Sequence, residues 1–195
     1  RYVPIDEGHP LQAQSPYSAS KIGADKLAEA FCLSFDLPVV TVRPFNTFGP
    51  RQTLRAVIPT IISQALGGES VRLGSLTPVR DFTYVKDTVE GFLAVAVAQN
   101  LTGELVNLGN GKGIAMGDLA RTILKMMNKE QTEIVSEEQR VRPENSEVYE
   151  LVCDNRKAKE TCGWEPGTSL QRGLEQTISW VEKNLEGMKP HLYNM

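Results

Sequence analysis

The most constraining feature of this sequence is an alternation between long amphipathic segments and short β-branched runs. Residues 16–35 carry apolar side chains at helical spacing, and residues 39–43, which follow, are rich in valine and threonine. A buried strand directly after a helix of this length is typical of a βαβ unit in a parallel sheet. The alternation continues to about residue 185, so the sequence predicts the α/β class.

The same patterns predict the remaining elements. We expect helices over residues 56–66, 86–99, 116–127, 155–161 and 169–185, and strands over 71–73, 78–85, 105–109, 134–135 and 151–153. Asp87 or the residue before it is expected to cap the helix over 86–99. Proline and polar residues predict loops over 1–16 and 137–147.

Composition excludes several classes of protein. The chain of 195 residues is 41% hydrophobic and 23% charged, which is typical of a soluble globular protein. A net charge of −3 without a basic block argues against a nucleic-acid partner. The sequence has no apolar run long enough to span a membrane, so we expect no membrane partner. Cys32, Cys153 and Cys162 form no C-x-x-C pair, which favours reduced thiols in a cytoplasmic protein. With only His9 and His191, we expect no metal and no histidine triad.

Tyr17 and Lys21, in the first predicted helix, form a candidate acid–base pair. Pro16 suits the first turn of a helix and Ser15 can act as its N-cap, so the helix is expected to begin there. Residues four apart project from one helix face, and an ammonium beside a phenol favours the phenolate, which can accept a proton. The spacing alone is weak evidence, because it also arises by chance on a solvated helix face.

Residues 43–52 follow the first predicted strand and are expected to form a loop. Ligands of open parallel sheets bind at the carboxyl ends of strands, and this segment offers Asn, Thr, Arg and Gln side chains to a polar ligand. The alternative is a connection rich in proline and glycine that only turns the chain.

Several stretches, in this order, resemble the extended short-chain dehydrogenase/reductase superfamily, which includes the NAD-dependent nucleotide-sugar epimerases and dehydratases. They are residues 15–21 (its catalytic helix), 43–50 (its strand-end loop), 79–87 (Val-Arg-Asp-Phe-Thr-Tyr-Val-Lys-Asp), and the late landmarks 107–109 and 163–166. Each is modest evidence alone, but their common order identifies the superfamily. The resemblance implies the C-terminal part of a Rossmann-type doubly wound parallel sheet plus a small α/β substrate-binding domain.

Residues 4–25 and 43–52 carry a finer resemblance to the NDP-N-acetylglucosamine 4,6-dehydratases of bacterial legionaminic-type sugar pathways. This resemblance implies NAD as the cofactor and a nucleotide sugar as the substrate. It implies that Tyr17 takes the proton of the sugar 4-hydroxyl while the C4 hydride passes to NAD, and that Lys21 holds the nicotinamide ribose. Loss of water across C5–C6 and return of the hydride to C6 would complete the reaction.

Two alternatives remain open. A UDP-sugar 4-epimerase of the same superfamily would return the hydride to C4, and a non-catalytic nucleotide-sugar-binding domain or an inactive fragment would do no chemistry. In the superfamily, the glycine-rich NAD loop and the residues that separate dehydratase from epimerase precede the tyrosine, and the sequence lacks them. We therefore expect a C-terminal portion of a larger protein, and we expect this chain alone neither to bind NAD tightly nor to turn over substrate.

The resemblance assigns site residues by their position in its motifs. Tyr17, Lys21, Pro44 and Phe45 are expected at the cofactor, and Asn46, Val71, Arg72, Leu73, Arg80 and Arg142 at the substrate. In this assignment residues 71–73 hold the nucleotide base, Asn46 binds the diphosphate, and the two arginines at 80 and 142 clamp it. The alternative for Arg80 is a structural pair with Asp81, and for Arg142 a solvated loop charge.

The resemblance also implies a division of the chain and a homodimer. The expected segments are 1–45 (catalytic helix and strand of the Rossmann domain), 46–85 (substrate-binding segment), 86–110 (helix and strand returning to the Rossmann domain) and 111–195 (substrate-binding domain and C-terminal helices). The superfamily commonly dimerises by packing the tyrosine helix into a four-helix bundle. Ala24, Leu27, Ala28 and Phe31 are expected to serve that interface or the domain core.

Overall fold

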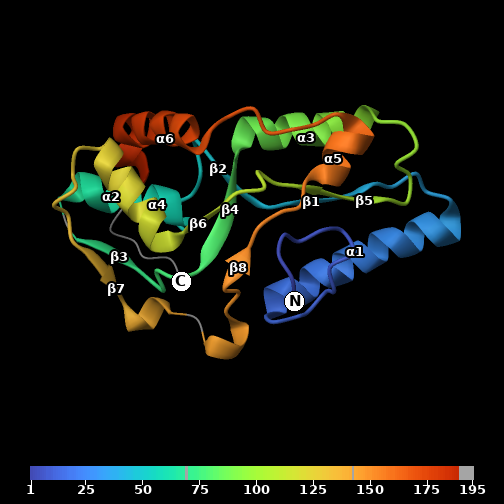
Figure 1. Cartoon of the computed structure of the whole chain (residues 1–195), viewed down its shortest axis with the longest axis horizontal. Coiled ribbons are helices and arrows are strands. Elements are labelled where there is room, and N and C mark those ends of the chain that lie inside the picture. Colours follow the sequence, from blue (N-terminus) through green and yellow to red (C-terminus); the bar gives the residue numbers. More distant parts are fainter. Residues whose placement is uncertain (69, 142, 189–195) are drawn as a thin grey trace.

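The computed structural model describes residues 1–68, 70–141 and 143–188 (Figure 1). The helices are α1 (Pro16–Phe35), α2 (Val57–Gly67), α3 (Val85–Val97), α4 (Met116–Met126), α5 (Arg156–Cys162) and α6 (Leu170–Asn184). The strands are β1 (Thr41–Pro44), β2 (Asn46–Phe48), β3 (Val71–Leu73), β4 (Val79–Tyr84), β5 (Leu105–Leu108), β6 (Gly113–Ala115), β7 (Ile134–Ser136) and β8 (Glu150–Leu151). Short 3₁₀ turns cover Glu138–Arg140, Glu144–Ser146 and Leu185–Met188.

The described strands form three small sheets in which parallel pairing dominates. Strand β1 pairs in parallel with β5, and β3 pairs in parallel with β7. Strand β4 is the centre of the third sheet, where β2 and β8 run parallel to it and β6 runs antiparallel. The parallel strands and the helices that connect them confirm the predicted α/β class.

Two apolar clusters hold these sheets. The larger one packs α2, α4 and α6 against β3 and β4, with Ile61, Ile62 and Ile123 fully buried in it. The smaller one joins β5, α3 and α5 around Val106 and Trp164. In Figure 1 the two groups lie side by side along the long axis of the molecule, and β4 lies between them. Helix α5 falls in the predicted 111–195 segment but packs against α3 and β5, which belong to the predicted 86–110 segment. The division of the chain into four segments stays a prediction.

Helix α1 begins as predicted. The Ser15 side chain accepts a hydrogen bond from the Ser18 backbone, the Ser18 side chain accepts one from the Ser15 backbone, and Pro16 occupies the first turn. None of the residues of α1 is buried in this structure, so Leu27 and Phe31 do not belong to a core formed by the described residues.

The structure corrects three sequence predictions. Residues 46–48, predicted as loop, form strand β2, and the glycine-rich stretch before Met116 contains the unpredicted strand β6. The cap of α3 is Tyr84, not Asp87 or Lys86. The Asp87 carboxylate instead accepts hydrogen bonds from the backbone N–H and the hydroxyl of Thr168, both at 3.0 Å, and so ties α3 to the segment before α6.

The carboxylate of Asp81, a fully buried residue in β4, ties three segments together. It accepts hydrogen bonds from the backbone N–H groups of Asn110 (2.9 Å), Gly111 (2.8 Å) and Cys153 (3.1 Å). Burial raises the pKa of this carboxyl, and the three N–H donors act in the opposite direction. Gly109 lets the chain approach, because a Cβ there would lie 2.2 Å from the Cβ of Cys153.

Replacing Asp81 by asparagine should lower the free energy of unfolding by about 2–3 kcal/mol, because an amide NH₂ would face buried N–H donors and leave at least one unpaired. Urea denaturation measures this change. The matched control is Asp118→Asn, whose side chain is 60% exposed in a surface ion pair and should cost less than about 0.5 kcal/mol. Equal effects of the two substitutions would show that the Asp81 hydrogen bonds do not hold the fold.

Candidate nucleotide-sugar site

The predicted catalytic helix and the predicted strand-end segment lie toward the same side of the molecule. Strands β1 and β5 end together, with Pro44 opposite Leu108, and the Phe45 N–H continues the ladder by donating to the Leu108 carbonyl at 2.8 Å. Helix α1 runs opposite to β1, so its first turn lies near the carboxyl end of that strand (Figure 1). This is the edge at which ligands of parallel sheets bind.

Tyr17 and Lys21 are presented to solvent on the first turns of α1. The Tyr17 side chain is 72% exposed, and the Lys21 Nζ lies 5.5 Å from the centroid of its ring. This distance is within the range of a cation–π contact and puts a positive charge beside the phenol. Both side chains are therefore accessible from solvent.

Pro44, Phe45 and Asn46 connect the β1–β5 sheet to the β4 sheet. Pro44 is exposed and Phe45 is half-buried, so both offer apolar surface at the strand end. The Asn46 Nδ2 donates to the Asp81 carbonyl at 3.0 Å, which fixes the amide against β4. Phosphate recognition through this side chain would have to use its second N–H.

The three residues of β3 differ in what they can offer a ligand. Val71 and Leu73 are buried in the larger apolar cluster, so their side chains face the core. Arg72 is exposed between them, and its Nη1 donates to Glu137 Oε1 at 3.1 Å. A nucleotide base at this strand would therefore meet the backbone and Arg72.

Arg80 forms an ion pair with a residue that sequence patterns did not single out. Its Nη2 donates to Glu147 Oε1 at 3.0 Å, and the two side chains are only 14% and 10% exposed. The alternative of a pair with Asp81 is wrong, because among the described residues that carboxylate accepts hydrogen bonds from three backbone N–H groups and forms no ion pair with Arg80. Arg142 lies outside the described residues.

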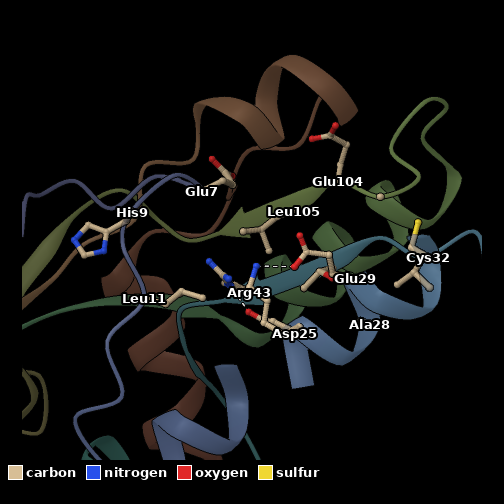
Figure 2. A pocket seen from close by; sticks show the side chains of 14 residues that line it. Glu7, His9, Leu11, Asp25, Ala28, Glu29, Cys32, Arg43, Glu104 and Leu105 are labelled. Atoms are coloured by element: carbon tan, nitrogen blue, oxygen red, sulfur yellow. Dashed lines mark hydrogen bonds and ion pairs between the residues drawn. The ribbon is translucent and has the colours of Figure 1, made fainter. Parts of the chain in front are cut away.

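A cavity of about 280 Å³ lies between α1 and the β1–β5 sheet (Figure 2). Its lining includes Asp25 of α1 and Arg43 of β1, whose Nε donates to Asp25 Oδ2 at 2.7 Å. Glu7 also lines the cavity and accepts a hydrogen bond from the N–H of Asn107, the residue of β5 opposite Arg43, at 2.8 Å. Sequence reasoning missed the Asp25–Arg43 pair, because it depends on how α1 lies over the sheet.

The described residues offer neither a metal-binding cluster nor a helix that could span a membrane. No group of three or more His, Cys, Asp or Glu side chains in residues 1–68, 70–141 and 143–188 could hold a metal ion. Over the same ranges, no helix combines the length and apolar character needed to cross a membrane.

Known proteins match most of the chain. Residues 1–177 match the family model described as GDP-mannose 4,6-dehydratase. A trifunctional UDP-glucose 4,6-dehydratase/UDP-4-keto-6-deoxy-D-glucose 3,5-epimerase/UDP-4-keto-L-rhamnose-reductase of Arabidopsis thaliana is 33% identical over 92% of this chain and 26% of its own length. A putative UDP-glucose 4-epimerase of Methanocaldococcus jannaschii is 30% identical over 94% of this chain and 58% of its own.

A solved structure extends the likeness to the fold. The dTDP-glucose 4,6-dehydratase of Bacillus anthracis, determined in complex with NAD, superposes with a TM-score of 0.87 at 30% identity. The superposition covers 95% of this chain and 58% of that one. These matches confirm the resemblance to the nucleotide-sugar epimerases and dehydratases and the Rossmann-type fold expected from the sequence. The chain spans less than two thirds of the length of these relatives.

Removing the partner of Arg80 should destabilise the protein, because a guanidinium in a partly buried position would lose a charged acceptor. Glu147→Gln should lower the free energy of unfolding by roughly 1–3 kcal/mol in urea titrations. The control is Glu165→Gln, which breaks an ion pair with Lys159 whose side chains are 58% and 61% exposed, and should have little effect. A Glu147→Gln variant as stable as the control would contradict the importance of the pair.

Proposed function

This chain belongs to the GDP-mannose 4,6-dehydratase family, and we propose that it carries the acid–base pair of an NAD-dependent nucleotide-sugar 4,6-dehydratase. The observation that carries the proposal is the Tyr17–Lys21 pair, exposed on the first turns of α1 with the ammonium 5.5 Å from the phenol ring. The pair lies on the side of the molecule where β1 and β5 end, which suits a ligand of a parallel sheet.

The residues present fit a dinucleotide cofactor at this edge. The Lys21 ammonium is exposed and can donate to ribose hydroxyls, and Pro44 and Phe45 offer apolar surface for a planar ring. A bound NAD would supply the hydride acceptor for oxidation at C4 of the sugar. The NAD complex of the Bacillus anthracis dehydratase supports this choice of cofactor.

Tyr17 would act as the general base of the oxidation. Its phenolate oxygen would take the proton of the sugar 4-hydroxyl, and the nearby Lys21 charge would stabilise the phenolate. Asn46 and Arg80 would hold the substrate diphosphate, Arg80 by exchanging the Glu147 carboxylate for phosphate oxygens. Arg72 and the backbone of Val71 and Leu73 would receive the nucleotide base, and Arg142 would be the second diphosphate arginine.

We assign an NDP-N-acetylglucosamine as the substrate, on the finer resemblance of residues 4–25 and 43–52. Loss of water from the 4-keto sugar makes the reaction a lyase reaction.

A 4-epimerase is the second candidate, and the Methanocaldococcus relative and its 30% identity favour it. A non-catalytic sugar-nucleotide-binding domain is the third, and it predicts that Tyr17 is dispensable.

We place the protein in the cytoplasm, where its three free cysteines would stay reduced.

We propose that two copies pair through α1. Leu27, Phe31, Leu33 and Phe35 are 45–78% exposed on this helix, a concentration of apolar surface typical of an interface. Leu27→Lys combined with Phe31→Lys should convert the complete enzyme from dimer to monomer in light-scattering measurements. Val97→Lys, at an 81% exposed position of α3, is the control and should leave the dimer intact. A wild type that is monomeric, or a double variant that stays dimeric, would contradict the proposal.

Tyr17→Phe tests the catalytic proposal, because it removes the proton acceptor and keeps the ring. In the complete enzyme with UDP-N-acetylglucosamine we expect kcat to fall by at least about 10³-fold with a small change in KM, as for loss of a general base. Tyr149→Phe is the control, since that side chain is also exposed, at 60%, and is assigned no part in the reaction. A Tyr17→Phe enzyme with wild-type turnover would support the non-catalytic alternative.

A further inference from the structure

Helix α1 contacts the rest of the molecule through one narrow stripe. Its half-buried residues follow a spacing of four, three, three and four positions, which defines one helix face. They are Ser18, Ile22, Asp25, Ala28 and Cys32. Apart from Ile22 these side chains are small or polar, so apolar packing contributes little to the position of α1 on the sheet.

Asp25 is the charged member of this stripe and lies at its centre. The Nε of Arg43 donates to its Oδ2 at 2.7 Å, and the two side chains are 24% and 26% exposed. Asp25 is the only hydrogen-bond partner of the Arg43 side chain among the residues that the structure describes. Figure 2 shows Arg43 on β1 among the side chains that line the cavity between α1 and the β1–β5 sheet.

The pair joins the two elements that carry the proposed cofactor residues. Lys21 lies one turn before Asp25, about 6 Å along the helix axis. On the other side, Arg43 directly precedes Pro44 and Phe45 at the end of β1. A shift of α1 along β1 would therefore move the Tyr17–Lys21 pair relative to the strand end.

We propose that Asp25 and Arg43 are positioning residues, whose ion pair sets the place of Tyr17 and Lys21 over the end of β1. This inference rests on the proposed function, because it assigns the pair a role in the geometry of that site. A mostly polar stripe tolerates several helix positions, whereas a charge-assisted hydrogen bond of this length is directional and favours one of them. Misplacement of an acid–base group by about 1 Å can cost on the order of 10²-fold in rate.

The helix supplies its own control pair. Lys26 and Glu29 form an ion pair at 2.6 Å in the next turn, with side chains 64% and 51% exposed, and both also line the cavity. This pair lies within α1 and ties the helix to nothing else. Its loss should leave the position of α1 unchanged.

The test compares kcat and KM of the complete enzyme with UDP-N-acetylglucosamine. Asp25→Asn should lower kcat at least about tenfold with KM within about threefold of wild type, since the reacting groups are misplaced while the substrate still binds. Asp25→Glu keeps the charge and should recover most of the rate. Glu29→Gln should stay within twofold of wild type. Circular dichroism and thermal melts set an assay temperature at which every variant is folded.

Each outcome decides for or against the inference. A lower melting temperature of Asp25→Asn with unchanged kcat would show a structural role only and overturn it, as would an equal loss in Glu29→Gln. If Asp25→Asn does not fold, Arg43→Lys replaces it, and wild-type kcat in that variant would overturn the inference. If Tyr17→Phe is inactive and Asp25→Asn is fully active, this inference alone fails. If Tyr17→Phe is fully active, the proposed function fails as well.

Discussion

The fold depends on a buried carboxylate at a point where several chain segments cross. Asp81 accepts hydrogen bonds from the loop after β5 and from the segment after β8, and its own carbonyl accepts one from Asn46 at the start of β2. A buried anion is costly unless donors surround it, and here backbone N–H groups satisfy it. The same contacts hold two residues of the proposed site in place. Arg80 directly precedes Asp81 in β4, and the Asn46 amide donates to the Asp81 carbonyl.

Ion pairs with different burial have different roles in this molecule. Arg80–Glu147 is nearly enclosed, at 14% and 10% exposure, so removal of the carboxylate would be destabilising, and the pair holds the arginine that a diphosphate would need. Asp25–Arg43 is half-buried and joins two elements, which suits it to setting a position. Lys26–Glu29 is exposed and local, and such pairs contribute little.

Elements with strong local signals could be predicted from the sequence, and contacts that depend on tertiary packing could not. The bounds of α1 and β3 agree with prediction, because a proline with a serine cap and the apolar–charged–apolar alternation of Val71-Arg72-Leu73 are local features. Strands β2 and β6 were missed, since Asn46 and Gly113 form strands only where β4 supplies the partner. The motifs located Arg80, but Glu147 lies 67 residues away in a polar loop without a recognisable pattern.

The central claim is that Tyr17 serves an oxidation at C4 followed by loss of water, and isotope labelling tests it most directly. UDP-N-acetylglucosamine carrying deuterium at C4 of the sugar would be incubated with the complete enzyme, and the product analysed by mass spectrometry. We expect a product lighter by one water that keeps the deuterium, now at C6, because the transferred hydride returns within the same active site. A product of unchanged mass with deuterium still at C4, or no turnover, would contradict the dehydratase.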